Sequence, residues 1–291
     1  MNKMTAIFKV AVIFFDYNGG MAELLTSLSN PLVKQARSLR QKKARAETGL
    51  FLVEGIHHVG EAFEAGWDIQ SVLYAPDLLT SGFARDLIPR LDAKKVRTQP
   101  VSKQVMDSLA EKDNPTGVLA LLSQRNLTLA GLPAADVSSS VALVSPQDPG
   151  NVGSILRTMD AVGADALFLL DGGVDEYHPS VVRASMGTIF WKPILRATFE
   201  EFTAWARRGG QRLIGTSAHA ERDYHAAQVA RPWVLILGSE QKGLSAAQLY
   251  ACDLTVSLPM RGHASSLNLS VAAGILLYEF ATNRRPERSR A

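Results

Sequence analysis

The chain of 291 residues contains a single cysteine, Cys252. It can therefore form neither an internal disulfide bond nor a zinc site built from several cysteines. A reducing cytosol is the simplest compartment for such a chain, so we expect a cytoplasmic protein. The net charge of +3, with an isoelectric point near 9.0, is compatible with a nucleic-acid partner but does not identify one. The hydrophobic content of 46% can supply the core of one large or two medium-sized domains.

The chain also lacks an apolar run long enough to cross a membrane, and we expect no membrane partner. The apolar stretch at 1–20 is interrupted by Lys9, and no clear A-x-A-like cleavage site follows it. We favour the interpretation that residues 1–20 are an extension outside the fold, with Met21 as the original start. A weak membrane or secretory signal is the alternative.

Several common active-site motifs are incomplete or missing. GSEQKGLS at 238–245 has the G-x4-G spacing of a phosphate loop, but Leu244-Ser245 follows where that loop has Lys-Ser/Thr, which argues against a nucleoside triphosphatase. The dinucleotide fingerprint G-x-G-x-x-G, the hydrolase elbow G-x-S-x-G and the metalloprotease pattern H-E-x-x-H are absent. The six histidines show no convincing metal spacing, so we expect no metal site.

Short strand-like runs and helical stretches alternate in residues 21–123, and we expect a small N-terminal α/β domain there. Residues 124–140 are small and polar and are the expected linker. A helix predicted to start at Asn30-Pro31 opens a basic segment. Its basic residues are Lys34, Arg37, Arg40, Lys42, Lys43 and Arg45. They form either a solvated helix face or a patch that binds RNA phosphates.

Residues 141–291 alternate apolar, β-branched runs such as VALVSP, ALFLLDG and WVLILGSE with helical segments. This alternation predicts βαβ units and a parallel sheet. Ligands of such sheets bind beyond the carboxyl ends of the strands. Three polar clusters follow strands and could meet at that edge. They are SPQDPGNVGSILRT at 145–158, LILGSEQKGLS at 235–245 and LPMRGHASSLNLS at 258–270.

Each cluster alone has an ordinary structural explanation. Asn151 can cap the helix that follows it, and Glu240 can be an acid favoured by the dipole at a helix N-terminus. Arg157 can be a surface arginine, exposed or paired. Three such clusters at three strand ends are much harder to explain in this way, and together they indicate a functional site.

The predicted final helix is apolar but begins among polar residues. In the ordinary explanation Ser265 caps it and Asn268 faces solvent. Leu267, Val271 and Ile275 lie four residues apart and predict its buried stripe. Because Asn268 lies next to the start of that stripe, the polar residues can also mark the place where the core ends and a site begins.

The three clusters resemble the three signature motifs of the SpoU (TrmH-like) family of SPOUT-superfamily RNA methyltransferases. The matching segments are N-x-G-x-x-x-R-T from Asn151, L-G-S-E-x-x-G-L from Leu237 and L-P-M-x-G-x-x-x-S-L-N-L-S-V-A from Leu258. The resemblance spans about 141–283. Residues 24–123 resemble the small substrate-binding domain, related to ribosomal proteins, that precedes the catalytic domain in many members.

This resemblance implies an α/β fold whose C-terminal SPOUT domain has a parallel sheet and a deep trefoil knot. Members of the family work as homodimers and transfer a methyl group from S-adenosyl-L-methionine to a ribose 2′-hydroxyl of rRNA or tRNA. We expect a structured RNA substrate, 23S rRNA, and the basic segment as its guide. The alternatives are a tRNA substrate and a catalytically inactive RNA-binding protein of the same fold. An unrelated nucleotide-binding α/β enzyme is disfavoured by the missing phosphate motifs.

The resemblance also assigns residues by position. Those expected at the cofactor are Gly238, Leu258, Leu267, Thr216 and Met260. Apolar walls and bare backbone suit an adenine ring. Arg157 matches the family arginine proposed to contact or activate the hydroxyl. Because arginine is almost never deprotonated in a protein, we prefer a cation that orients the phosphate and stabilises the developing alkoxide.

The remaining assignments surround Arg157. Asn151 would fix the loop that carries Arg157, and Glu240 would be a buried acid that orients it. Ser266 and Asn268 would face the active site. Arg183 occupies a position where relatives also carry an arginine, and it is a candidate for binding RNA phosphate.

Overall fold

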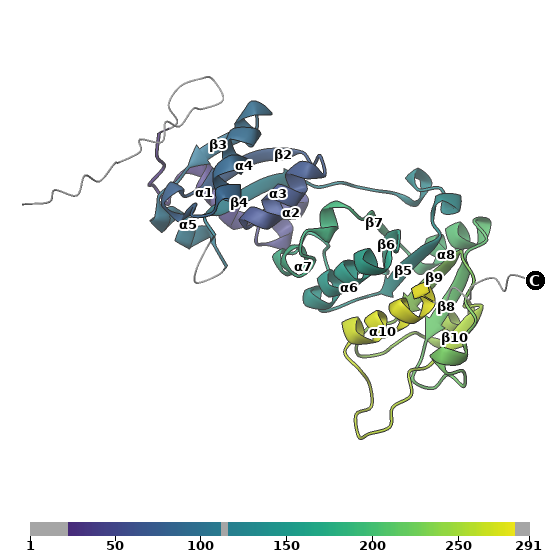
Figure 1. Cartoon of the computed structure of the whole chain (residues 1–291). Helices are drawn as coiled ribbons and strands as arrows, with labels where there is room; N and C mark the ends of the chain where they lie inside the picture. Colours follow the sequence, from purple (N-terminus) through teal and green to yellow (C-terminus); the bar gives the residue numbers. More distant parts are fainter. Residues whose placement is uncertain (1–22, 112–115, 283–291) are drawn as a thin grey trace, which may run out of the picture.

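The computed structural model of the protein describes residues 23–111 and 116–282 (Figure 1). The extension predicted at 1–20 lies outside the described residues. Within the described part of the chain, no helix is both long and apolar enough to cross a membrane.

The N-terminal domain is built on a four-stranded sheet with strand order β1-β4-β2-β3. Strand β4 runs antiparallel to both of its neighbours, and β2 pairs with β3 in parallel. The strands are β1 (Leu50–Glu54), β2 (Ile69–Tyr74), β3 (Arg97–Pro100) and β4 (Val118–Ser123). The helices are α1 (Pro31–Ser38), α2 (Lys42–Thr48), α3 (Ile56–Glu64), α4 (Gly82–Ala93) and α5 (Lys103–Leu109), with the 3-10 helix η1 (Pro76–Leu78). The small α/β domain expected there is present.

The basic segment begins as its sequence predicts but does not form one helix. Helix α1 has Pro31 at its first position, and the Asn30 side chain caps it by accepting a hydrogen bond from Leu32 N at 2.9 Å. The chain leaves the helical conformation at Gln41, whose backbone is extended, before α2 starts at Lys42. The six basic residues therefore belong to two short helices and the turn between them.

The C-terminal domain has a six-stranded sheet in the order β10-β8-β9-β5-β6-β7, and every neighbouring pair is parallel. The strands are β5 (Ser139–Val144), β6 (Ala166–Leu170), β7 (Ile194–Ala197), β8 (Arg212–Thr216), β9 (Trp233–Leu237) and β10 (Leu254–Val256). Every residue of β5, β6 and β9 is buried, as in sheets covered on both faces. The predicted parallel sheet is confirmed.

Helices cover both faces of this sheet (Figure 1). Alternate strand residues divide the core: Val141 and Leu143 pack on the side of α6, α7 and α10, while Ala142 and Val144 pack with α8. The helices are α6 (Pro149–Val162), α7 (Pro179–Ala184), α8 (Phe199–Arg208), α9 (Ala246–Tyr250) and α10 (Leu269–Thr282), with 3-10 helices η4 (Thr188–Phe190) and η5 (Tyr224–Ala226). The trefoil knot implied by the family resemblance stays a prediction.

The segment predicted to be a linker holds the 3-10 helices η2 (Leu129–Gly131) and η3 (Ala134–Asp136), and β5 begins at Ser139 within its predicted end. The segment packs on the C-terminal domain. The indole of Trp205 donates to Leu132 O at 2.8 Å, and the amide of Gln211 donates to Ala134 O and Val137 O at 2.8 Å each. These contacts hold the segment along α8 and the start of β8.

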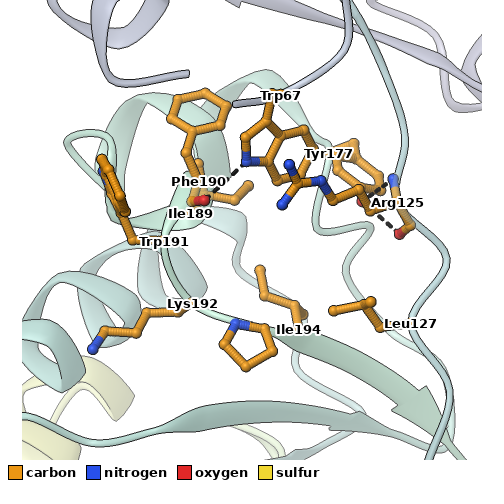
Figure 2. Close-up of a pocket in the computed structure, with 10 residues that line it drawn as sticks. Trp67, Arg125, Leu127, Tyr177, Ile189, Phe190, Trp191, Lys192 and Ile194 are labelled. Atoms are coloured by element: carbon orange, nitrogen blue, oxygen red, sulfur yellow. Dashed lines mark hydrogen bonds between the residues drawn. The ribbon is translucent and has the colours of Figure 1, made fainter. Parts of the chain in front are cut away.

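Aromatic residues join the two domains (Figure 2). Trp67, which follows α3, donates from Nε1 to Phe190 O at 2.8 Å and packs edge-on against the Phe190 ring. Its ring also contacts Phe51 of β1 and Tyr177 of the C-terminal domain edge-on. The indole is therefore a fixed part of the domain junction.

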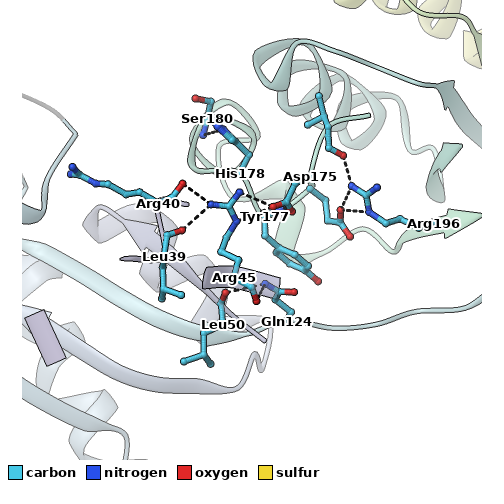
Figure 3. Close-up of polar contacts among 12 residues, drawn as sticks. Leu39, Arg40, Arg45, Leu50, Gln124, Asp175, Tyr177, His178, Ser180 and Arg196 are labelled. Atoms are coloured by element: carbon cyan, nitrogen blue, oxygen red, sulfur yellow. Dashed lines mark hydrogen bonds and ion pairs between the residues drawn. The ribbon is translucent and has the colours of Figure 1, made fainter. Parts of the chain in front are cut away.

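A buried ion pair joins the domains beside these aromatic residues (Figure 3). Arg45 of α2 is 1% exposed and donates from Nε and Nη2 to Asp175 Oδ2 at 2.9 and 2.6 Å. Its Nη1 donates to the carbonyl oxygens of Leu39 and Arg40 at 2.8 Å each. The prediction that Arg45 binds RNA phosphate is wrong, because burial and these four hydrogen bonds leave it no access to RNA.

Candidate active site

A cavity of about 780 Å³ lies at the carboxyl ends of β8, β9 and β10, beside the start of α6 and α10. The structure brings most of the predicted site residues to it. The predicted cofactor residues Thr216, Gly238, Leu258, Met260 and Leu267 line it, as do the predicted catalytic residues Asn151, Glu240, Ser266 and Asn268. Three segments far apart in the sequence therefore meet at one edge of the sheet.

Helix α6 carries the first motif, and Asp148 caps it. Asp148 Oδ1 accepts hydrogen bonds from Gly150 N at 2.6 Å and Asn151 N at 3.4 Å, and Pro149 takes the first helical position. The interpretation of Asn151 as the cap is wrong. Asn151 lies within the first turn of the helix and is 6% exposed, so its side-chain amide can reach sideways to the other two motifs.

The side chains of the three motifs form one hydrogen-bonded chain. Asn151 Nδ2 donates to Glu240 Oε1 at 3.1 Å, and Asn268 Nδ2 donates to Asn151 Oδ1 at 2.9 Å. A carboxylate only accepts hydrogen bonds, so Glu240 holds the Asn151 amide with its nitrogen toward the second motif and its oxygen toward the third. The direction of each bond follows from the charge of Glu240.

Glu240 also accepts from the backbone before α6. Its Oε2 lies 3.1 Å from Gln147 N, and its Oε1 lies 3.2 Å from Asp148 N. A negative charge is favourable at this end of a helix. Glu240 is exposed rather than buried, and no described hydrogen bond or ion pair joins it to Arg157. The prediction that it orients Arg157 is not met, since its oxygens serve Asn151 and the α6 loop.

Asn268 starts helix α10 as well as joining the motifs. Its Oδ1 accepts from Ser270 N at 2.9 Å and Val271 N at 3.4 Å, and its carbonyl accepts the first helical bond from Ala272 N. The expectation that Ser265 caps this helix is wrong, because the helix begins four residues later at Leu269. One residue thus fixes the helix start with its oxygen and the first motif with its nitrogen.

The second motif forms a tight loop with exposed backbone. A Cβ atom on Gly238 would lie 2.0 Å from the carbonyl carbon of Gly243, so only glycine fits there. Gly243 has φ of +63°, in the left-handed region that glycine adopts without strain. The loop therefore folds back on itself and presents main-chain groups to the cavity.

The rest of the cavity wall is suited to an aromatic ring. Leu258 is half-buried, and Leu267 is 39% exposed at the cavity. Thr216 ends β8 and donates from Oγ1 to Ile236 O at 3.2 Å. Apolar side chains beside bare backbone fit the adenine ring and polar edges of a nucleoside cofactor. Within the described residues, no group of three or more His, Cys, Asp or Glu side chains is placed to hold a metal ion.

Arg157 does not join these residues. It is exposed on α6 and is not among the residues that line the cavity. Outside the backbone hydrogen bonds of α6, no hydrogen bond or ion pair connects its side chain to another described residue. It lies six residues after Asn151 on the same helix, which is about 240° around the helix axis, so the two side chains point in different directions.

The apolar stripe predicted on α10 is wrong. Leu267, Val271 and Ile275 are 39%, 51% and 36% exposed, and the helix buries another set of residues instead. The buried set is Ala273, Leu276, Leu277 and Phe280. Because the helix is apolar on nearly every side, spacing alone could not identify the core-facing side.

The other predicted RNA-binding residues differ in whether their side chains are already engaged in contacts within the protein. Arg40 donates to the carbonyl oxygens of Leu109 and Ala110 at 2.6 and 2.7 Å, and Arg37 donates to Ser108 Oγ at 3.1 Å. Arg183 pairs with Glu111 at 2.6 Å. Arg183 is nevertheless exposed, and the exposed members of the basic segment are Lys34, Lys42 and Lys43, with Lys43 Nζ at 3.8 Å from Glu47 Oε1. The arginines of the segment serve mainly to hold the domain together.

Several residues at the cavity were not predicted. His219 and Lys242 line it, and Asp148 both lines it and caps α6. The dipeptide Asp148-Pro149 was the available signal for the cap, because an acidic residue before a proline is a common helix start. Nothing in the local sequence marks His219, which reaches the cavity through the loop after β8.

Comparison with known proteins agrees with this geometry. Residues 138–278 match the SpoU rRNA Methylase family, and residues 30–120 match the MRM3-like substrate binding domain. The chain is 33% identical over 270 residues to the 23S rRNA (uridine(2479)-2′-O)-methyltransferase of Streptomyces viridochromogenes. The alignment covers 90% of this chain and 93% of the relative. The chain is 30% identical over 255 residues to the 23S rRNA (guanosine(2553)-2′-O)-methyltransferase RlmP of Bacillus subtilis, covering 87% and 97%.

A solved structure extends the comparison to three dimensions. The AdoMet-bound rRNA methyltransferase from Sinorhizobium meliloti is 35% identical and superposes with a TM-score of 0.81, covering 89% of this chain and 97% of that one. A parallel α/β domain with the three motifs at one edge, preceded by a substrate-binding domain, defines a SPOUT methyltransferase. The chain belongs to the SpoU rRNA methylase family. The family, fold class and enzyme class predicted from the motifs are confirmed.

Proposed function

We propose that this protein transfers the methyl group of S-adenosyl-L-methionine to a ribose 2′-hydroxyl of 23S rRNA. The observation that carries the proposal is the hydrogen-bonded chain of Asn268, Asn151 and Glu240 at the mouth of a cavity walled by Leu258 and Leu267. Both characterised relatives named above act on a 23S rRNA ribose, which favours 23S rRNA over tRNA. Their targets are a uridine and a guanosine, so the base at the target is not carried over.

The cofactor would occupy the cavity. Backbone groups of the Gly238 loop would hold its polar edges, and the side chains of Leu258, Leu267 and Met260 would enclose the adenine. Thr216 would close the floor at the end of β8. When bound, S-adenosylmethionine supplies a methyl group already activated by a sulfonium charge.

The protein then has to align the hydroxyl and favour its loss of a proton. Asn151, Glu240 and Asn268 hold the first and third motifs in fixed positions, and Ser266 lies beside them at the cavity. We assign Arg157 the role of a permanently charged cation that orients the neighbouring phosphate of the RNA and stabilises the developing alkoxide. A phosphate oxygen or water takes the proton.

A homodimer explains how Arg157 reaches a reaction site. Val271, Ile275 and Tyr278 expose an apolar face on α10, and faces of this kind mark protein interfaces. Helix α10 packs on α6, where a Cβ on Gly274 would lie 4.0 Å from Thr158 Cγ2. Thr158 is the neighbour of Arg157. In a two-fold dimer the second copy would dock through its own α10, which begins at its cavity, and would so bring that cavity close to Arg157 of the first.

We assign RNA guidance to the N-terminal domain at 21–123 and catalysis to residues 141–291, joined by the linker at 124–140. Lys34, Lys42 and Lys43 are the exposed cations of the basic segment, and binding through them should weaken as salt rises. Arg183 would add a phosphate contact on releasing Glu111. An enzyme of ribosomal RNA with one cysteine fits a cytoplasmic location.

The test is methyl transfer from labelled S-adenosylmethionine to separated 23S rRNA and tRNA taken from cells that lack the gene. The proposal expects label in 23S rRNA and none in tRNA. Label in tRNA alone would favour the tRNA alternative. Cofactor binding without transfer to either RNA would favour an inactive RNA-binding protein of the same fold.

A further inference from the structure

A second cavity lies at the junction between the two domains (Figure 2). It shares no lining residue with the cofactor cavity. It has a volume of about 180 Å³ and is lined by Trp67 of the N-terminal domain, Arg125 and Leu127 of the linker, and Pro193 and Ile194 at the start of β7. We call it the junction pocket. It is smaller than the roughly 300–1,000 Å³ of pockets for drug-sized ligands, so its size suits one planar group.

We propose that the junction pocket binds one unpaired base of the RNA substrate. This inference rests on the proposed function, because it takes RNA as the substrate. Proteins recognise single-stranded RNA by stacking its bases on aromatic rings and on arginine guanidinium planes. The junction pocket offers both kinds of surface together with apolar walls.

Arg125 supplies the charge of the junction pocket. Its guanidinium carbon lies 4.2 Å from the centre of the Trp67 ring, and its Nη2 donates to Gly66 O at 3.1 Å. Among the described residues, no carboxylate forms an ion pair with it. Lys192, the other cation lining the pocket, pairs with Asp160 at 3.2 Å. Arg125 therefore carries a positive charge with no described ion-pair partner, held over the face of an indole.

Neighbouring hydrogen bonds hold Arg125 and Trp67 in place. The Tyr177 hydroxyl donates to Arg125 O at 2.8 Å and accepts from Arg125 N at 2.9 Å. Burial raises the pKa of Tyr177, so the hydroxyl keeps its proton and continues to donate. Trp67 is held by its bond to Phe190 O. A binding surface ordered in advance loses little conformational entropy when a ligand binds.

The position of the junction pocket separates it from the chemistry. Ile194 is the first residue of β7, so the pocket lies at the amino end of that strand, whereas the cofactor cavity lies at the carboxyl ends of β8, β9 and β10. A four-residue strand is about 13 Å long, and β7 lies at the edge of the sheet beyond β5 and β6. A base bound there cannot be the nucleotide methylated in the cavity of the same protomer. It would anchor another part of the RNA to both domains at once.

The experiment measures binding of protein-free 23S rRNA by filter retention at fixed salt, together with kcat for methyl transfer, in the full-length protein. Arg125→Ala should weaken RNA binding at least about fivefold, the lower end of what one stacked base contributes, with kcat and cofactor affinity unchanged. Arg125→Lys keeps the charge but loses the planar surface, so it should bind RNA as weakly as Arg125→Ala. The matched control is Arg208→Ala, which removes an exposed charge on α8 and should change binding less than about twofold.

Because Arg125 also contacts the N-terminal domain, its substitution could weaken RNA binding by changing the fold. Trp191→Ala is a second variant that tests the pocket without removing Arg125. Trp191 lines the junction pocket, is 52% exposed and makes no described contact with Arg125. Its Nε1 donates to Glu61 Oε2 at 2.8 Å in an exposed bond that contributes little to stability, so Trp191→Ala should weaken RNA binding and lower the melting temperature by only a few degrees. Wild-type RNA affinity in both Arg125→Ala and Trp191→Ala would overturn the proposal that the junction pocket binds a base. Wild-type RNA affinity in Arg125→Lys would also overturn it. Because RNA binding is measured directly, absence of methyl transfer by the wild type would count against the proposed function and not against the pocket.

Discussion

The side chain of Asn268 donates a hydrogen bond from Nδ2 to Oδ1 of Asn151 at 2.9 Å, across 117 residues of sequence. The same side chain caps α10 through its oxygen. One residue therefore couples the start of the last helix to the first motif, and its two functions can be separated by substitution.

Asn268→Asp keeps the capping oxygen and replaces the donor nitrogen with a second oxygen that faces Asn151 Oδ1. Asn151 cannot turn its amide over to compensate, because its own oxygen would then face the Glu240 carboxylate. We expect the free energy of unfolding to remain near that of the wild type and kcat to fall on the order of 100-fold, as for misplaced reacting groups. Asn268→Ala should lose the same activity and also about 1 kcal/mol of stability through the lost cap. Denaturant unfolding and methyl-transfer kinetics measure both, and wild-type kcat in Asn268→Asp would contradict the coupling.

Gly238→Ala should act on cofactor binding. Its Cβ would lie 2.0 Å from the Gly243 carbonyl carbon, so the loop must move away from the position that presents its backbone to the cavity. We expect S-adenosylmethionine affinity, measured by calorimetry, to fall at least about tenfold, or ~1.4 kcal/mol. Gly262→Ala is the matched control, because a Cβ there meets nothing within 4 Å. Equal affinities in the two variants would show that the cofactor does not depend on this loop.

Arg157 should act on the cavity of the other protomer. Neither Arg157→Ala nor Asn268→Asp should be active alone, but a mixed dimer holds one cavity with an intact Asn268 and an intact Arg157 from its partner. With random assortment of protomers in a dimer, co-expression of the two variants should restore about a quarter of wild-type activity. A mixture no more active than its components would indicate that Arg157 works within its own protomer or has no role in catalysis.

Arg45→Met should destabilise the protein strongly, because it leaves the Asp175 carboxylate, whose side chain is only 15% exposed, without its charged partner. Removing one member of a buried pair costs about 3–5 kcal/mol. Lys43→Met on the same helix is the control, since its pair with Glu47 is exposed and contributes less than about 0.5 kcal/mol. Equal denaturation midpoints for the two variants would contradict a structural role for Arg45.

Local sequence patterns predicted the elements well. The alternation of apolar strands with helical segments gave the parallel sheet, and the position of each motif after a strand placed Asn151, Glu240 and Asn268 at one edge. Both follow from short-range rules, since parallel strands bring their carboxyl ends together.

Contacts between distant residues were beyond those patterns. Arg45 sits in a basic segment but is buried by Asp175, 130 residues away, and nothing in its neighbourhood announces this partner. The exposed side of α10 was mistaken for the buried one because both sides are apolar, and tertiary packing decides between them. Arg157 matches its motif but lies off the cavity of its own chain, a placement that no single-chain pattern could give.

The most direct measurement is to map where the methyl group goes. A 2′-O-methyl group removes the hydroxyl that attacks the neighbouring phosphate in alkali, so the modified position resists alkaline cleavage. After incubation of the protein with S-adenosylmethionine and unmodified 23S rRNA, the account predicts one new alkali-resistant linkage, absent when the Asn268→Asp variant is used. Transfer to a base, with every linkage still cleaved by alkali, or no transfer to 23S rRNA at all, would contradict it.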